Sequence, residues 1–315
     1  MTGTIAITDH GWYEFLLTQP DIDEVNFWTP SSHFSFKGQL GSPFFFKLKA
    51  EYHHAICGFA FFARYAALPD WLAWESFEIK NGVPNLEALQ ERVGGLRKSI
   101  QYRSAAPSNQ IGCILLSQPV FFPRDAWVEG PRDWSRHNLR YKYYEIGAGE
   151  GLRIWEECKL RVRSQPIEPI LDPTTAVHEA IERYGPAVLV QPRLGQGTFR
   201  VAVLDAYSRA CAITLEHSLP ALEASHIKPY GQDGPHSVSN GVLLRSDLHR
   251  LFDKGYLTIT PDYRVEVSAR LKVDFHNGKT YYPLHGQKIL VPENQHERPA
   301  QDLLRWHNEK IYKTA

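Results

Sequence analysis

The sequence predicts an α+β protein with two domains joined by a linker. Its 315 residues exceed the usual size of one domain, and each part is long enough to bury its own core. Residues 1–163 alternate strand-like runs with a few helical segments, which predicts a small, partly closed β-barrel with helices. Residues 191–315 contain two short apolar strands followed by a helix. Residues 164–190 are rich in proline without periodic apolar positions, which predicts a semi-rigid linker and a short helix.

Strands are expected in the first domain where aromatic and β-branched residues form runs that end at proline, glycine or serine. Helices are expected where apolar residues recur at helical spacing, and Asp9 is a plausible N-cap of the first helix. The expected strands are EVNFWTP, SPFFFKLKA, AICGFAFFARY and IGCILLSQPVFF, and the expected helices are ITDHGWYEFLL, PDWLAWESFE, NLEALQERVGGLRKSIQ and GEGLRIWEECKLR.

Aromatic residues are dense in this first domain, and most of their rings are expected to belong to its core. A minority could line a pocket in which a flat ring is held between aromatic faces. That arrangement is the physical requirement for holding a flipped-out nucleobase. By ring type and neighbourhood, the candidates for such a pocket are Trp28, Phe34, Trp71 and Trp74.

The second domain is expected to begin with the helix QGTFRVAVLDAYSR, for which Thr198 is a possible N-cap. GVLLRS predicts a strand, after which Ser246 can cap a helix that ends at Gly255. YLTIT and RVEVS alternate apolar and polar residues around PDY, as in a hairpin. Further strands are expected at CAIT, PALEASHI and HGQKILVP, and an amphipathic helix is expected from Pro299 onward.

Composition limits the classes of partner and the compartment. The chain has 35 Lys and Arg against 35 Asp and Glu, so no strong overall field draws it to DNA or to an anionic membrane, although basic residues slightly prevail from Arg193 onward. The four cysteines form no CxxC pair, which favours reduced, buried thiols over a zinc ribbon. No apolar run is long enough to span a membrane and no signal peptide is evident, so we expect a cytoplasmic protein without a membrane partner.

Chemistry concentrates between Glu223 and Gly255. His226 is expected at the end of a strand, and an imidazole with a pKa near neutrality suits a general base. Asn240 lies in the loop before the next strand, where its amide can tie down the backbone that orients His226. His249 and Asp253, four residues apart, share one face of the following helix and form a partial ligand set for a divalent ion. The expected roles are base, brace and ligands, in chain order.

Each of these residues also has an ordinary structural explanation. A single histidine is often a surface or core residue, Asn240 before Gly241 is a common turn pair, and Asp253 is compatible with a solvated helix end. Nearby side chains could take over some of these roles, and basic residues that flank the site could contact phosphates or simply be solvated. The possible substitutes are His217, His236 and Asp247, and the basic residues are Lys228, Arg245 and Arg250. Their joint occurrence, with the right types and order, favours a site.

Residues 193–315 resemble the HNH endonuclease domain of many bacterial restriction-type proteins, a ββα-metal fold. The segments that carry the resemblance are RLGQGTFRVAVLDAYSRACAIT, ASHIKPY, NGVLLRSDLHRLFDKGY and LLRWHNEKIY. The resemblance implies His226 as general base, Asn240 as the middle residue, His249 as a metal ligand, and Mg²⁺ or Mn²⁺ as cofactor. Many HNH nucleases place an aspartate or histidine ligand directly before the base, whereas this chain has Ser225. Either fewer protein groups hold the metal, or another residue such as Asp253 compensates.

The first domain resembles PUA-like barrels of the EVE type, which read modified bases when fused to HNH domains. This resemblance is carried by FWTPSSHFSF, SPFFFKL, GFAFFARYAALPDWLAWESF and ILLSQPVFF. The whole chain is thus similar to modification-dependent, type IV-like restriction endonucleases, which cut double-stranded DNA containing 5-methylcytosine or 5-hydroxymethylcytosine. Because double-stranded DNA has two strands to cut and each chain would have one active site, we expect a homodimer. The alternatives are an HNH endonuclease without modification dependence, whether sequence-specific or unspecific, and a non-catalytic nucleic-acid binding protein.

Overall fold

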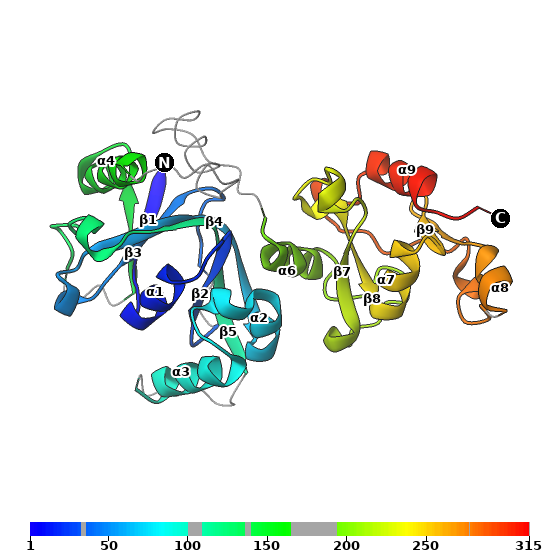
Figure 1. The fold of residues 1–315 in the computed structure, drawn as a ribbon, viewed down its shortest axis with the longest axis horizontal. Coiled ribbons are helices and arrows are strands. Elements are labelled where there is room, and N and C mark those ends of the chain that lie inside the picture. Colours follow the sequence, from blue (N-terminus) through cyan, green and yellow to red (C-terminus); the bar gives the residue numbers. More distant parts are fainter. Residues whose placement is uncertain (33–35, 100–108, 136–139, 165–193, 277, 315) are drawn as a thin grey trace. The chain divides into compact units, whose positions relative to one another are not determined.

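The computed structural model describes residues 1–32, 36–99, 109–135, 140–164, 194–276 and 278–314 (Figure 1). The chain divides into two compact units, Met1–Thr198 (unit 1) and Phe199–Ala315 (unit 2). Two of the expectations from the sequence, Phe34 and nearly all of the linker at 164–190, lie outside the described residues. All four cysteines are free and buried, as the sequence predicts. None of the helices in the described ranges has the length and apolar character needed to cross a bilayer.

Unit 1 contains one six-stranded mixed sheet. Its strand order is β2-β5-β4-β3-β1-β6, in which β1 runs parallel to β3 and the other neighbours are antiparallel. The strands are β1 Thr2–Ile7, β2 Glu24–Thr29, β3 Pro43–Lys47, β4 Ile56–Pro69, β5 Gln110–Phe121 and β6 Tyr141–Glu145. Over the residues described, no ladder joins the edge strands β2 and β6, so the sheet is open and the predicted barrel is not seen to close. Strands β1 and β6 extend the sheet beyond β3 and do not return to β2.

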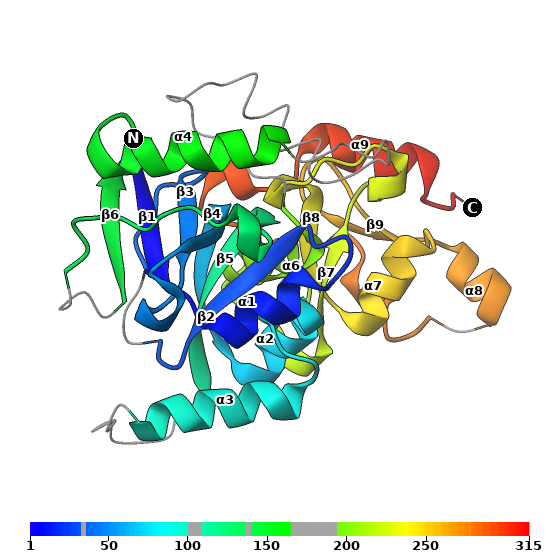
Figure 2. The same ribbon diagram turned by 60° about the vertical axis from the view of Figure 1, so that its left-hand side comes forward.

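The phenylalanine run of β3 explains how this sheet is covered. Successive side chains of a strand point to opposite faces. Phe45 packs against Trp155 of α4 (Gly149–Ser164), with ring centroids 6.0 Å apart, whereas Phe46 packs against Trp12 of α1 (His10–Leu17) at 5.3 Å. Helices α4 and α1 therefore lie on opposite faces, each over its own apolar cluster (Figures 1 and 2). The remaining helices of the sheet domain are α2 Asp70–Phe77 and α3 Leu86–Ser99, where the sequence predicts helices.

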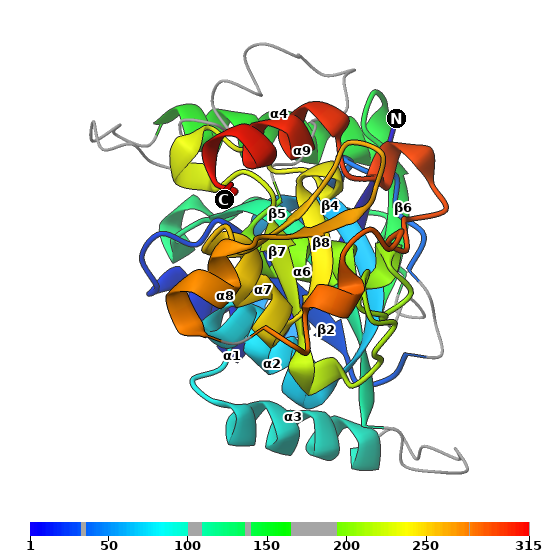
Figure 3. The same cartoon turned by 90° about the vertical axis from the view of Figure 1, so that its right-hand side faces the viewer.

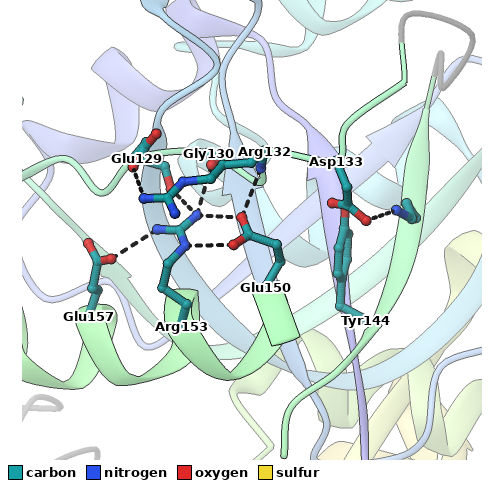
Figure 4. Close-up of polar contacts among 9 residues, drawn as sticks. Glu129, Gly130, Arg132, Asp133, Tyr144, Glu150, Arg153 and Glu157 are labelled. Carbon is teal, nitrogen blue, oxygen red and sulfur yellow. Dashed lines mark hydrogen bonds and ion pairs between the residues drawn. The ribbon is translucent and has the colours of Figure 1, made fainter. Parts of the chain in front are cut away.

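Polar contacts fix the first turns of helices α1 and α4. Asp9 caps α1 as predicted, because its Oδ1 accepts a hydrogen bond from the Trp12 N–H at 3.0 Å. At the start of α4, Glu150 accepts from the Arg132 backbone N–H at 2.8 Å and pairs with Arg153, which lowers the pKa of Glu150 to about 2 (Figure 4). Arg153 also donates to the Gly130 carbonyl at 2.9 Å. The loop before β6 is thereby attached to the first turn of α4.

Helix α6 (Gln196–Ala206) begins at the end of unit 1, and its cap differs from the prediction. Thr198 lies inside the helix. The buried carboxylate of Glu24, from β2, accepts the N–H groups of Gly197 at 2.8 Å and Thr198 at 2.9 Å. A carboxylate at these free N–H groups stabilises the helix start. The cap comes from a strand distant in sequence, which local pattern could not reveal.

Unit 2 contains two hairpins and four helices or helix segments, counted over its described residues. They are α6, the hairpin of β7 (Leu222–His226) and β8 (Gly241–Arg245), α7 (Ser246–Asp253), the hairpin of β9 (Leu257–Ile259) and β10 (Val265–Val267), α8 (Arg270–Phe275) and α9 (Gln301–Lys310). Figure 3 shows α7 beside the β7–β8 hairpin. Both predicted hairpin strands around PDY and the C-terminal amphipathic helix are confirmed.

Three predictions for unit 2 are wrong in detail. CAIT forms a turn and not a strand, although the Ala212 N–H donates to the Leu243 carbonyl at 2.7 Å. HGQKILVP forms only an isolated bridge, because its backbone divides its bonds between Tyr263 on one side and Ala212 on the other. Ser246 is the first residue of α7; the N-cap position is Arg245, whose side chain makes no capping hydrogen bond within the described structure. The helix does end before Gly255, whose positive φ of 75° follows the last turn as predicted.

Candidate active site

The β7–β8 hairpin brings the ends of two strands together. His226 is the last residue of β7 and pairs with Gly241, the first residue of β8. Asn240 therefore lies directly beside the end of β7, and its carbonyl accepts the Ile227 N–H at 2.9 Å. Helix α7 follows β8 without a loop and carries His249 and Asp253. The strand, loop and helix thus gather all four residues that the sequence singles out.

Asn240 is fully buried and closes the loop between the strands. Its Oδ1 accepts the Lys228 N–H at 2.9 Å, while its Nδ2 donates to the Lys228 carbonyl at 2.9 Å and to the Pro235 carbonyl at 3.0 Å. An amide is the side chain that can accept and donate at once in this way. These bonds fix the backbone immediately after His226, which is the geometry that a brace requires.

His226 has a defined ring plane and a lowered pKa. Its imidazole stacks on Phe199 of α6, with centroids 3.9 Å apart and planes within 10°. Burial lowers the pKa of His226, and the nearby His236 and His249 lower it further. The imidazole is therefore neutral at neutral pH and can accept a proton.

His249 lies between two carboxylates, one at each ring nitrogen. Its Nδ1 is 2.6 Å from Oε2 of Glu223 on β7, and its Nε2 is 3.3 Å from Oδ2 of Asp253. Burial and, to a smaller extent, Glu223 raise the pKa of Asp253, while His249 and Lys254 oppose this shift. The sequence analysis missed Glu223, although its position three residues before His226 on the same strand placed it near the site.

The distance between the His249 and Asp253 side chains is compatible with their binding one divalent ion. Two ligands on neighbouring positions of an octahedral ion, each roughly 2.1 Å from it, are about 3 Å apart, and Nε2 and Oδ2 are separated by 3.3 Å. Among the described residues, no group of three or more His, Cys, Asp or Glu side chains is arranged to hold a metal. Ser225 is buried, and its hydroxyl has no hydrogen-bond partner among the residues that the structure describes. A pair of ligands would leave most positions of a bound ion to water and substrate, as Mg²⁺ tolerates.

The three candidate phosphate contacts differ in their surroundings. Lys228 holds its ammonium 5.6 Å from the centre of the Trp306 ring, and Arg250 is exposed. Arg245 is engaged with Asp247 through two contacts of 2.6 and 2.8 Å, and Tyr281 donates to the same carboxylate at 3.2 Å. Of the three, Arg245 is the least available to a phosphate.

Three of the four candidate base-pocket residues, Trp28, Trp71 and Trp74, lie in the described part of unit 1. The Trp28 indole N–H donates to the Asn81 carbonyl at 2.9 Å, which attaches β2 to the turn after α2, and Trp71 and Trp74 are partly exposed on α2. A cavity of about 430 Å³ lies elsewhere, and its lining contains none of these rings; it is lined by Gly11, Phe15, Gly82, Val83, Pro84, Ala88, Glu91 and Arg92.

Comparison with known proteins agrees with the geometry of unit 2. Residues 211–260 match the family model described as HNH endonuclease, so this segment is an HNH endonuclease domain. It contains His226, Asn240, His249 and Asp253. Among solved structures, the chain is similar to one titled "Modification dependent TagI restriction endonuclease", at 24% identity and a TM-score of 0.26. That match covers 36% of this chain and 38% of the other, well under half of each. No curated protein matches the chain.

Proposed function

We propose that the protein is a modification-dependent DNA endonuclease. Its HNH domain, at residues 191–315, hydrolyses phosphodiester bonds in double-stranded DNA, and residues 1–163 select DNA that carries 5-methylcytosine or 5-hydroxymethylcytosine. Residues 164–190 link the two. The observation that carries the nuclease half is the neutral His226, held beside the His249 and Asp253 pair on one hairpin and helix within the HNH match.

The residues of unit 2 divide the work of hydrolysis. His226 takes a proton from the attacking water, Asn240 keeps the backbone beside the base in place, and His249 with Asp253 holds Mg²⁺ or Mn²⁺. When bound, the ion stabilises negative charge on the phosphate and the leaving oxygen. Of the three candidates, Arg245 pairs with Asp247, whereas no ion pair of Lys228 or Arg250 with a carboxylate is seen among the described residues, which favours these two as phosphate contacts.

The reader half rests on the resemblance of the first domain to EVE-type, PUA-like domains and on its density of aromatic rings. Such a domain would flip the modified cytosine out of the duplex and hold it against aromatic faces. Trp28, Phe34, Trp71 and Trp74 remain the proposed pocket residues.

Digestion of matched DNA tests the proposal. Three duplexes of one sequence, with cytosine, 5-methylcytosine or 5-hydroxymethylcytosine, are incubated with Mg²⁺ or Mn²⁺. We expect cleavage of the modified duplexes and little cleavage of the plain one. No cleavage of any duplex, over many sequence contexts, would contradict the nuclease half.

Equal cleavage of all three duplexes would instead support an HNH endonuclease without modification dependence. One observation favours this second candidate: the three proposed pocket residues that the structure describes, Trp28, Trp71 and Trp74, do not line the unit 1 cavity. Under this alternative, unit 1 would position DNA without reading a mark. The same digestion therefore separates the two candidates.

A further inference from the structure

Glu223 makes a short contact in the candidate site. It lies on β7, and its Oε2 is 2.6 Å from Nδ1 of His249 on α7. His226 lies three residues later on the same strand, so the two side chains point to opposite faces. His226 accordingly stacks on Phe199 of α6, whereas Glu223 contacts α7. The carboxylate of Glu223 therefore acts on the helix that carries the proposed metal ligands.

We propose that Glu223 is a positioning residue that holds His249 in the tautomer protonated on Nδ1. The lone pair of Nε2 is then free to bind a metal ion on the side of the ring where Asp253 would also bind it. A carboxylate oxygen accepts hydrogen bonds, so Nδ1 must carry the proton of this contact. Nε2 is then the unprotonated nitrogen of the neutral ring, and it is the nitrogen that faces Asp253 at 3.3 Å. This inference rests on the proposed metal-dependent function.

The distances distinguish a positioning role from direct ligation. Two groups that bind the same ion at roughly 2.1 Å each are about 3 Å apart or more. Glu223 and Nδ1 are 2.6 Å apart, too close to hold an ion between them and at the short end of hydrogen-bond lengths. Asp253 and Nε2 have the wider separation. Metal-binding histidines commonly donate their second N–H to a carboxylate, which fixes the ring and increases its basicity.

Glu223 also bears on the absence of a metal ligand at Ser225, the position directly before the base. Ser225 supplies neither a carboxylate nor an imidazole, and its buried hydroxyl finds no hydrogen-bond partner within the described ranges. Glu223 is two residues earlier and faces the same side of β7. Strand β7 thus contributes its negative charge indirectly, through His249, and the two carboxylates of Glu223 and Asp253 together favour a cation at the helix.

The test uses the full chain without metal and the variant Glu223→Gln, which keeps the size of the side chain. Two measurements are made: ¹⁵N NMR of the His249 imidazole, assigned by comparison with His249→Ala, and Mn²⁺ affinity by electron paramagnetic resonance. At a pH at which the imidazole of His249 is neutral, we expect the unmodified protein to show one tautomer, protonated on Nδ1. In Glu223→Gln we expect a mixture of tautomers and Mn²⁺ affinity lower by roughly 10- to 100-fold.

Glu266→Gln, a change to a strand glutamate of β10, is the matched control and should alter neither measurement. Thermal unfolding shows whether each variant is folded; if Glu223→Gln does not fold, Glu223→Asp replaces it and should show the same changes to a smaller extent. Unchanged tautomer and Mn²⁺ affinity in a folded Glu223→Gln would overturn the positioning role and leave the proposed nuclease intact. Unchanged Mn²⁺ affinity in both His249→Ala and Asp253→Ala would overturn the metal site itself, and with it both proposals.

Discussion

His226 acquires its properties from neighbours that are distant in sequence. Phe199 fixes the plane of its ring, and burial keeps it neutral. A proton acceptor on a rigid strand end loses little orientational freedom when water and phosphate arrive, which is the advantage of a preorganised base. Phe199 was predicted as a helix residue but not as a support of the base, because the face of α6 that meets β7 depends on packing.

Replacing His226 by alanine tests its role as base. We expect the cleavage rate to fall by roughly 10²- to 10⁴-fold, since a positioned general base contributes about that much. DNA binding in a gel-shift assay should change little. His296→Ala, an exposed histidine of the same unit, is the control and should cleave normally. Cleavage by folded His226→Ala at the normal rate would assign the proton transfer to another group.

Asn240→Asp tests the brace at almost constant shape. The carboxylate keeps the acceptor for the Lys228 N–H but places an oxygen against the carbonyls of Lys228 and Pro235, which now accept from Nδ2. Buried groups left unpaired cost about 1–3 kcal/mol each, so we expect the free energy of unfolding to fall by at least about 2 kcal/mol in denaturant titration. Asn294→Asp, on the exposed turn before α9, should change it little. Equal stabilities for the two variants would contradict the bracing role.

At the scale of elements, a second buried histidine joins three parts of unit 2. His307 of α9 donates from Nε2 to the Phe252 carbonyl of α7 at 3.2 Å and accepts at Nδ1 from the Thr258 hydroxyl of β9 at 2.8 Å. Its ring also stacks on Phe252 at 3.7 Å. The C-terminal helix therefore holds α7 at Phe252, the residue directly before Asp253.

This contact predicts a defined loss of stability in acid. Burial lowers the pKa of His307 to about 4, against an ordinary value near 6.5 in the unfolded chain. Below pH 6.5 the unfolded state binds a proton that the folded state does not. The stability that the neutral His307 contributes is therefore complete above pH 6.5 and is lost progressively as the pH falls to about 4. The full effect is about 3 kcal/mol. His307→Gln should flatten the dependence of the free energy of unfolding on pH in this window; an unchanged slope would contradict the argument.

Elements with strong local pattern could be predicted from the sequence, and elements defined by pairing could not. The phenylalanine run of β3 and the helix α1 with its Asp9 cap are confirmed. Strands β1 and β6 were missed, because TGTIAI and YKYYE are short and gain their definition from each other across a ladder. CAIT has strand-like composition, but its backbone bonds go to two different neighbours, so no ladder forms.

At the scale of the molecule, the placement of the candidate site was easier to predict than that of the proposed base pocket. Residue types and order singled out His226, Asn240, His249 and Asp253 as candidates, and a short hairpin and the helix after it carry them without long-range folding. A base pocket in unit 1 would require rings from separate strands and helices to converge. That depends on sheet closure and register, which the sequence pattern does not determine, and the observed sheet is open where a barrel was expected.

One active site per chain and two strands to cut predict that two copies act together. Chains with different affinity tags, one carrying His226→Ala, are co-expressed and purified through both tags, which isolates mixed dimers. A mixed dimer has His226 in only one of its two chains. We therefore expect it to convert supercoiled plasmid with modified cytosine to nicked circles that accumulate, whereas a dimer with His226 in both chains yields linear DNA. Double-strand cuts by mixed dimers at the normal rate would show that one site cuts both strands in succession. Failure to recover any doubly tagged species would contradict the dimer itself.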